Sequence, residues 1–80
     1  MTKYSLICTN VNGKKVYGIR IEALNGDVYV YRYISSFYEE ADELIHKMMQ
    51  DYISPVHFND IVTDYLAQLY YAKLSMNGLL

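Results

Sequence analysis

The sequence SPVHFNDIVTDYLAQLYYAKL, residues 54–74, predicts one long helix with a well-marked start. Ser54 belongs to the residue types that cap helix N-termini, and Pro55 loses no hydrogen bond at the first helical position. Behind this start, apolar side chains recur at helical spacing and form one stripe. The stripe consists of Phe58, Ile61, Val62, Tyr65, Leu69 and Ala72. We therefore expect a helix over about residues 55–75, with a stop signal at Asn77-Gly78.

The same helix is apolar on a second side. Leu66, Tyr70 and Leu74 follow one another at i, i+4 and i+8, with Ala67 and Tyr71 beside them. This second stripe lies about a quarter-turn from the first. A small sheet covers one stripe of a helix, so the second stripe needs another cover. That cover is the preceding helix, a second copy of the chain or a different protein.

Two Asn-Gly pairs, Asn12-Gly13 and Asn25-Gly26, each separate runs of alternating apolar residues. Asn-Gly favours the two-residue type I′ turn, because both central positions of that turn need positive φ. Two such turns predict a three-stranded antiparallel meander. The predicted strands cover about residues 3–10, 15–23 and 27–34.

Counting outward from the two turns predicts which residues face each other. Across the second turn, Ile21 lies opposite Val30 and Ile19 lies opposite Arg32. The inner face then collects Tyr4, Leu6, Cys8, Tyr17, Ile19, Ile21, Val28, Val30 and Ile34. An unpaired charge on this face is costly, so Arg32 either reaches out at the sheet edge or pairs with a helix carboxylate. The candidate carboxylates are Asp60 and Asp64, and an anion site is the functional alternative.

The outer face of the predicted sheet is rich in tyrosine. Tyr29, Tyr31 and Tyr33 lie there together with Arg20, whose guanidinium can stack on tyrosine rings. Aromatic and cationic side chains on a sheet can bind single-stranded nucleic acid. Tyrosine is also a good strand former, and the sheet lacks a basic surround. Nucleic-acid binding is therefore the alternative rather than the favoured interpretation.

Ser36 and Glu39 have the spacing of a capping box and predict a first helix over about residues 36–51. The apolar stripe of this helix consists of Phe37, Ala41, Leu44, Ile45, Met48 and Tyr52. Together the elements predict one α+β domain over residues 1–80 in the order β-β-β-α-α. Both helices are expected to pack on one face of the sheet.

Composition narrows the classes of function. The 80 residues carry a net charge of −2, are 52% hydrophobic and include one cysteine, Cys8. No charge block favours a polyanion partner, and no apolar run reaches the length of a membrane span. We expect a soluble cytoplasmic protein that takes no cofactor and no small-molecule substrate.

Candidate chemistry is sparse. His57, Asp60 and Asp64 lie at i, i+3 and i+7 and could begin a metal site. The plainer interpretation is that acids near a helix start complement the helix dipole. Cys8 lies mid-strand, where cysteine behaves as a small hydrophobe, and both Gly-containing turns are hairpin turns rather than phosphate loops. We expect no catalytic site.

Three segments resemble a known family. They are Tyr17-Gly18-Ile19-x-Ile21, Ile34-Ser35 and, most specifically, the Ser-Pro-x-His-x-x-Asp start of the long helix at residues 54–60. Over about residues 16–66 the chain is similar to short uncharacterised proteins, common in anaerobic Gram-positive bacteria, that share a domain of unknown function. The resemblance implies the architecture and a bacterial or mobile-element origin, and it implies no activity.

These observations predict a small non-catalytic protein-interaction or regulatory module that forms a homodimer or binds another protein. The predicted docking surface is the second helix stripe, Leu66, Tyr70 and Leu74, or the outer tyrosine face, Tyr29, Tyr31, Tyr33 and Arg20. A phage- or mobile-element-encoded inhibitor of a host protein is the more specific hypothesis. The alternative is a single-stranded nucleic-acid binder that uses the sheet surface.

Overall fold

The computed structural model of the chain describes residues 1–76 and has the predicted α+β order, β-β-β-α-α, with a short 3-10 turn before the last helix. Its elements are β1 (Lys3–Val11), β2 (Lys14–Glu22), β3 (Val28–Ser35), α1 (Tyr38–Gln50), η1 (Pro55–His57) and α2 (Phe58–Met76). The strands form one antiparallel sheet in the order β1-β2-β3. The predicted helix stop at Asn77-Gly78 lies outside the described residues.

The first Asn-Gly pair forms the predicted type I′ turn. Asn12 has φ 52° and Gly13 has φ 82°, the positive values that this turn needs at both central positions. The register of β1 and β2 is therefore as predicted, with Cys8 opposite Tyr17.

The second Asn-Gly pair forms a longer turn. The Ala23 N–H donates to the Asp27 carbonyl at 2.9 Å, and the Gly26 N–H donates to the Ala23 carbonyl at 3.0 Å. Gly26 has φ 92°, whereas Asn25 does not adopt positive φ. Instead, the Asn25 Oδ1 accepts a hydrogen bond from the Asp27 N–H at 3.0 Å. The loop thus contains one residue more than the two-residue turn that the sequence predicted.

This extra residue makes the predicted register of β3 wrong. Ile21 pairs with Tyr29 and Ile19 pairs with Tyr31. A shift of one residue turns every side chain of a strand to the opposite face. The side chains of Tyr29 and Tyr31 therefore lie on the inner face of the sheet and pack against the core.

The residues that were expected inside the sheet lie outside it. Val28 is 47% exposed and Val30 is 43% exposed, although both were predicted to face the core. Arg32 is also exposed, for the same reason. Within residues 1–76, its predicted ion pair with Asp60 or Asp64 is not formed.

A bulge in β3 keeps Ile34 in the core, as predicted. The register changes between Tyr17 and Ile19 of β2, and Gly18 lies between them, opposite the extra residues of β3. A Cβ atom at Gly18 would lie 2.1 Å from the backbone oxygen of Tyr31, so only glycine fits there. Beyond the bulge Ile34 is buried, with 7% of its surface exposed.

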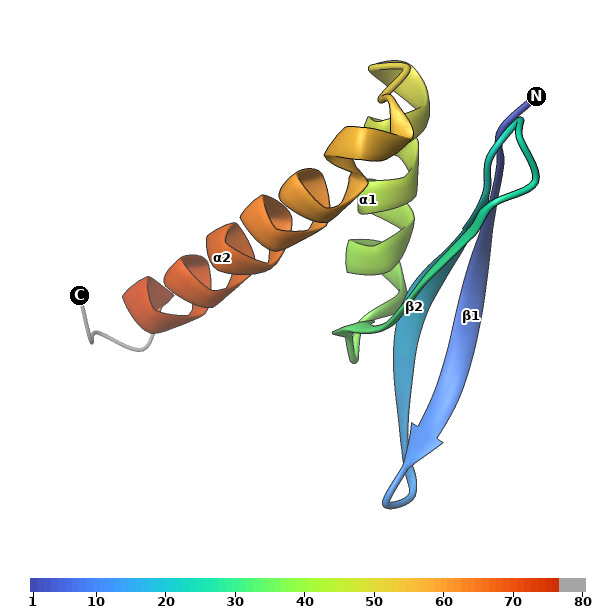
Figure 1. Cartoon of the computed structure of the whole chain (residues 1–80). Coiled ribbons are helices and arrows are strands. Elements are labelled where there is room, and N and C mark those ends of the chain that lie inside the picture. The colour runs from blue at the N-terminus through green and yellow to red at the C-terminus, as the bar shows by residue number, and fades with distance from the viewer. Residues whose placement is uncertain (77–80) are drawn as a thin grey trace.

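Helix α1 lies against the inner face of the sheet, and α2 diverges from α1 along its length (Figure 1). The largest fully buried side chains come from β2 and from both helices, which places the core between them. They are Phe58, Ile19, Ile21, Leu44 and Met48. Phe37 and Tyr52, which were predicted in the α1 stripe, are 55% and 92% exposed. They lie just outside the two ends of α1.

The start of α1 differs from the predicted capping box. Phe37, not Ser36, occupies the N-cap position, and its side chain makes no capping bond. The buried Ser35 supplies the polar contacts, because its hydroxyl donates to the Glu40 carboxylate and accepts from the Phe37 N–H at 3.0 Å. The cap residue Ser54 likewise makes no side-chain bond, and its carbonyl accepts from the His57 N–H.

The far end of the β1–β2 hairpin extends past α1 (Figure 1). Cys8 was predicted to face the core, but it is exposed, because within residues 1–76 no helix covers this part of the sheet. The register of β1 and β2 was predicted correctly, whereas the part of the sheet that the helices cover was not. Within residues 1–76, no helix combines the length and the apolar character needed to cross a membrane.

Candidate docking surface

The second half of α2 extends away from the sheet (Figure 1). We call residues 66–76 the α2 arm. None of these eleven residues is buried, whereas Phe58, Val62 and Tyr65 in the first half of the helix are. The root of the arm still contacts the core, because Leu66 and Leu69 pack against it.

The arm is almost uncharged and apolar on several sides. Its one charged residue is Lys73. Tyr70 is 62% exposed and Tyr71 is 59% exposed, whereas Leu66 and Leu74 are half-buried. The predicted row Leu66, Tyr70 and Leu74 thus lies on the surface and is only partly covered by the chain itself.

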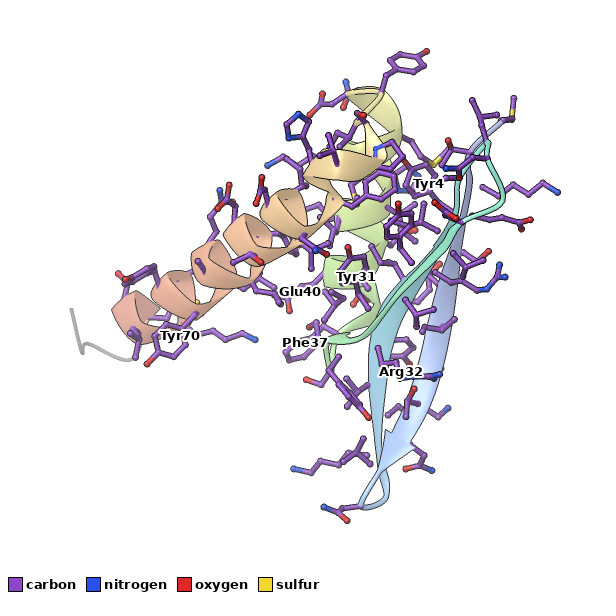
Figure 2. All side chains as sticks on the ribbon, in the orientation of Figure 1. Tyr4, Tyr31, Arg32, Phe37, Glu40 and Tyr70 are labelled. Carbon is purple, nitrogen blue, oxygen red and sulfur yellow. The ribbon has the colours of Figure 1, made fainter. Side chains whose placement is uncertain are left out.

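Lys73 connects the arm to the start of α1. Its Nζ lies 3.8 Å from Oε1 of Glu40 and 5.8 Å from the ring centroid of Phe37. Figure 2 shows Phe37 and Glu40 on the side of α1 toward the arm. An ion pair of this kind and a cation–π contact each contribute about 1 kcal/mol or less to stability. The two contacts are therefore weak, and they leave the arm exposed to solvent.

Tyr65 fixes the root of the arm. Its hydroxyl donates to the Glu40 carbonyl at 2.8 Å and to Oε1 of Glu43 at 3.3 Å. Burial, with smaller contributions from the carboxylates of Glu43 and Glu40, raises the pKa of Tyr65 to about 12. The hydroxyl therefore remains a hydrogen-bond donor at neutral pH and ties α2 to the first turns of α1.

The predicted outer tyrosine face does not exist as a single surface. The ring of Tyr29 packs edge to face on Phe58, with centroids 5.1 Å apart. The Tyr31 hydroxyl donates to Oδ1 of Asn59, and burial raises its pKa, with the charge of Tyr29 a smaller cause. Tyr33 is the member of the predicted trio that is exposed, at 63%.

The charged candidates form ordinary surface contacts. Arg20 lies 3.7 Å from Glu22 on the outer face, and both side chains are 43% exposed. His57 lies 3.9 Å from Asp60, as expected for neighbours in the first turn of a helix. Among residues 1–76, no three His, Cys, Asp or Glu side chains are grouped so that they could hold a metal ion.

Residues 1–68 match the model of a family of unknown function, DUF6514. The chain belongs to the DUF6514 family. The match includes β1, which the resemblance noted from the sequence left out. No curated protein and no solved structure matches the chain significantly.

The DUF6514 match divides the candidate surface. It covers the sheet, α1 and the root of α2, together with Leu66, and it ends before Tyr70 and Leu74. The buried core of the DUF6514 fold therefore lies inside the matched region, whereas most of the α2 arm lies beyond it.

An apolar cleft of about 720 Å³ inside the DUF6514 match was not predicted from the sequence. Its lining includes Tyr4 of β1, Leu24 of the second turn, Met49 of α1 and Tyr52 of the helix connection. Tyr52 has φ 50°, a left-handed conformation that bulky residues rarely adopt, and it is 92% exposed. The cleft is assembled from four separate segments, so no local sequence pattern signals it.

Proposed function

We propose that the protein is a small non-catalytic interaction module that binds a protein partner through the α2 arm. The observation that supports this proposal is the exposed, nearly uncharged arm that continues a well-packed helix. A helix that is apolar on several sides is normally buried, and a short helical segment with few tertiary contacts is only marginally stable in water. A partner that covers the arm would bury its apolar surface and stabilise its helical conformation.

The chemistry of the arm indicates the kind of partner surface. Tyr70 and Tyr71 supply large contact areas with polar tips, and Leu74 supplies an aliphatic side chain close to them. Such a helix fits an apolar groove, in the manner of other helix-in-groove complexes. Because Lys73 is the only charge in the arm, charge pairing contributes little to recognition.

The proposed mode of action is occupation of the partner's groove. A module of this kind regulates its partner in proportion to the amount bound, as a stoichiometric inhibitor does. The nucleic-acid alternative loses its structural support, since Tyr29 and Tyr31 face the core rather than a shared outer surface.

Site-specific photo-cross-linking tests the proposal. A photoreactive phenylalanine analogue replaces Tyr70 in one protein and Gln68, which is exposed on the other side of the arm, in the control. We expect one discrete adduct from position 70, with little from position 68. The captured protein is then purified, and its complex with the unmodified chain is measured by calorimetry. Equal labelling from both positions, or no complex between the purified proteins, would contradict the proposal.

A further inference from the structure

β1 is an open edge of the sheet. The strand order leaves one side of β1 and one side of β3 without a neighbouring strand. The bulge interrupts β3, and bulges are one way in which proteins protect an edge. β1 instead pairs with β2 without interruption from Lys3 to Val11, and within residues 1–76 no strand pairs with its other side.

The turn geometry determines which backbone groups of β1 are free. In a two-residue hairpin the flanking residues, here Val11 and Lys14, form a hydrogen-bonded pair, and such pairs alternate along the strands. The intervening residues direct their N–H and C=O groups away from β2. These residues are Tyr4, Leu6, Cys8 and Asn10. Within residues 1–76, no backbone hydrogen bond joins this edge to another segment.

The exposed edge lacks the usual protection. Proteins discourage strand addition with proline, inward charges, bulges or very short edge strands. From Tyr4 to Val11 the strand contains no proline, no glycine and no charged residue. It is also nine residues long, longer than the usual strand of five or six residues.

We propose that β1 pairs with β1 of a second copy of this chain, antiparallel, about a two-fold axis at Ile7. This register places Leu6 opposite Cys8 of the second copy and Tyr4 opposite Asn10 of the second copy. All four outward-facing residues of each strand are then used, giving about eight backbone hydrogen bonds between the copies. The two sheets become one six-stranded sheet, and the exposed Cys8 gains a neighbouring strand.

Charge and symmetry favour a second copy as the occupant. Residues 4–11 carry no charge, so antiparallel pairing of two identical strands brings no like charges together. Lys3 of each copy lies opposite Val11 of the other, at the two ends of the interface. The interface is closed by its two-fold symmetry and leaves the α2 arm free, so it does not depend on the proposed function of the arm.

Disulfide formation tests the register directly. In a Cys8→Ser background, Ile7→Cys places two thiols opposite each other across the axis, where Cα atoms of a non-hydrogen-bonded pair lie about 4.5 Å apart. The matched control is Ser5→Cys in the same background, whose two copies lie about 14 Å apart along the strands. We expect mild oxidation to yield a covalent dimer of the Ile7→Cys protein and not of the control. No dimer, or equal dimer from both proteins, overturns the proposal.

Sedimentation equilibrium tests the interface without cross-linking. The protein concentration is varied between about 10 μM and 1 mM, the range in which we expect the dissociation constant of a small interface to lie. Cys8→Pro removes one outward N–H at an exposed position, and Cys8→Ala keeps it. We expect association in the natural chain and in Cys8→Ala, and at least about tenfold weaker association in Cys8→Pro. Association that is lost in Tyr70→Asp instead would assign the dimer to the α2 arm and overturn the proposal. If Cys8→Pro fails to fold, as judged by circular dichroism, the disulfide result decides.

Discussion

The rings of Tyr29 and Phe58 meet edge to face, with their centroids 5.1 Å apart and their planes at 86°. Phe58 is fully buried and begins α2, so this contact joins the third strand to the root of the helix that carries the arm. The contact exists because the second turn contains one residue more than a type I′ turn. The conformation of Asn25 thereby decides which side of β3 builds the core.

The register of β3 predicts opposite effects for two neighbouring substitutions. Tyr29→Ala removes a ring packed on Phe58 and should lower the free energy of unfolding by about 2–4 kcal/mol. Val30→Ala, at a position 43% exposed, should lower it by less than about 1 kcal/mol. Urea unfolding followed by circular dichroism measures both changes. A larger loss for Val30→Ala would indicate the register of a two-residue turn.

The bulge predicts that Gly18 tolerates no side chain. Gly18→Ala places its Cβ against the backbone oxygens of Tyr31 and Arg32, at 2.1 and 2.6 Å, which forces β3 to move. We expect a loss of more than about 3 kcal/mol, enough to unfold a marginally stable domain of this size. Gly13→Ala is the matched control, because it introduces positive-φ strain of about 1 kcal/mol and meets no atom within 4 Å. Equal thermal stability of the two variants would argue against the bulge.

Two adjacent serines distinguish the observed helix start from a capping box. Ser35→Ala removes the hydroxyl that contacts the Phe37 N–H and the Glu40 carboxylate, and should cost about 1–3 kcal/mol. Ser36→Ala, at an exposed position, should change stability by no more than about 0.5 kcal/mol. Thermal unfolding measures both, and the reverse order would restore Ser36 as the cap.

The raised pKa of Tyr65 predicts a loss of stability at high pH. The folded protein keeps this proton up to a pKa of about 12, whereas the unfolded chain loses it near the ordinary value of 10.0. The folded state thus binds more protons between these values, and the free energy of unfolding falls as pH rises through this window. Burial raises the pKa of Tyr4 and of Tyr31 in the same direction. Urea unfolding from pH 9 to 12 should show a shallower decline for Tyr65→Phe than for the natural chain or for Tyr71→Phe, and identical slopes would contradict the assignment.

Most of the architecture could be predicted from local signals. The element order follows from hydrophobic periodicity, and the first hairpin follows from Asn12-Gly13, whose backbone adopts the angles that Asn-Gly favours. The second hairpin has the same dipeptide and a different turn. The difference arises because the side chain of Asn25 bonds to the backbone of Asp27, a competition that the dipeptide alone does not reveal.

The errors at the candidate site all follow from tertiary relationships. The one-residue shift moved Tyr29 and Tyr31 inward and Arg32 outward, which removed the predicted tyrosine face. The exposure of Cys8 depends on where α1 begins relative to the hairpin, which no pattern in the strand records. The row of Leu66, Tyr70 and Leu74 lies along one side of α2, as the spacing predicted, because helical spacing is a local property. Its role as a docking surface stays a prediction.

The most direct test of the account measures how the captured partner binds two charge variants of the α2 arm. Tyr70→Asp places a carboxylate in the proposed contact, and Gln68→Asp places the same charge on the other side of the same arm. The account predicts that Tyr70→Asp weakens binding by at least about tenfold, because the new carboxylate is buried without a partner in the complex. Gln68→Asp should bind with an affinity within about twofold of that of the natural chain. Equal affinities for the two variants would contradict it.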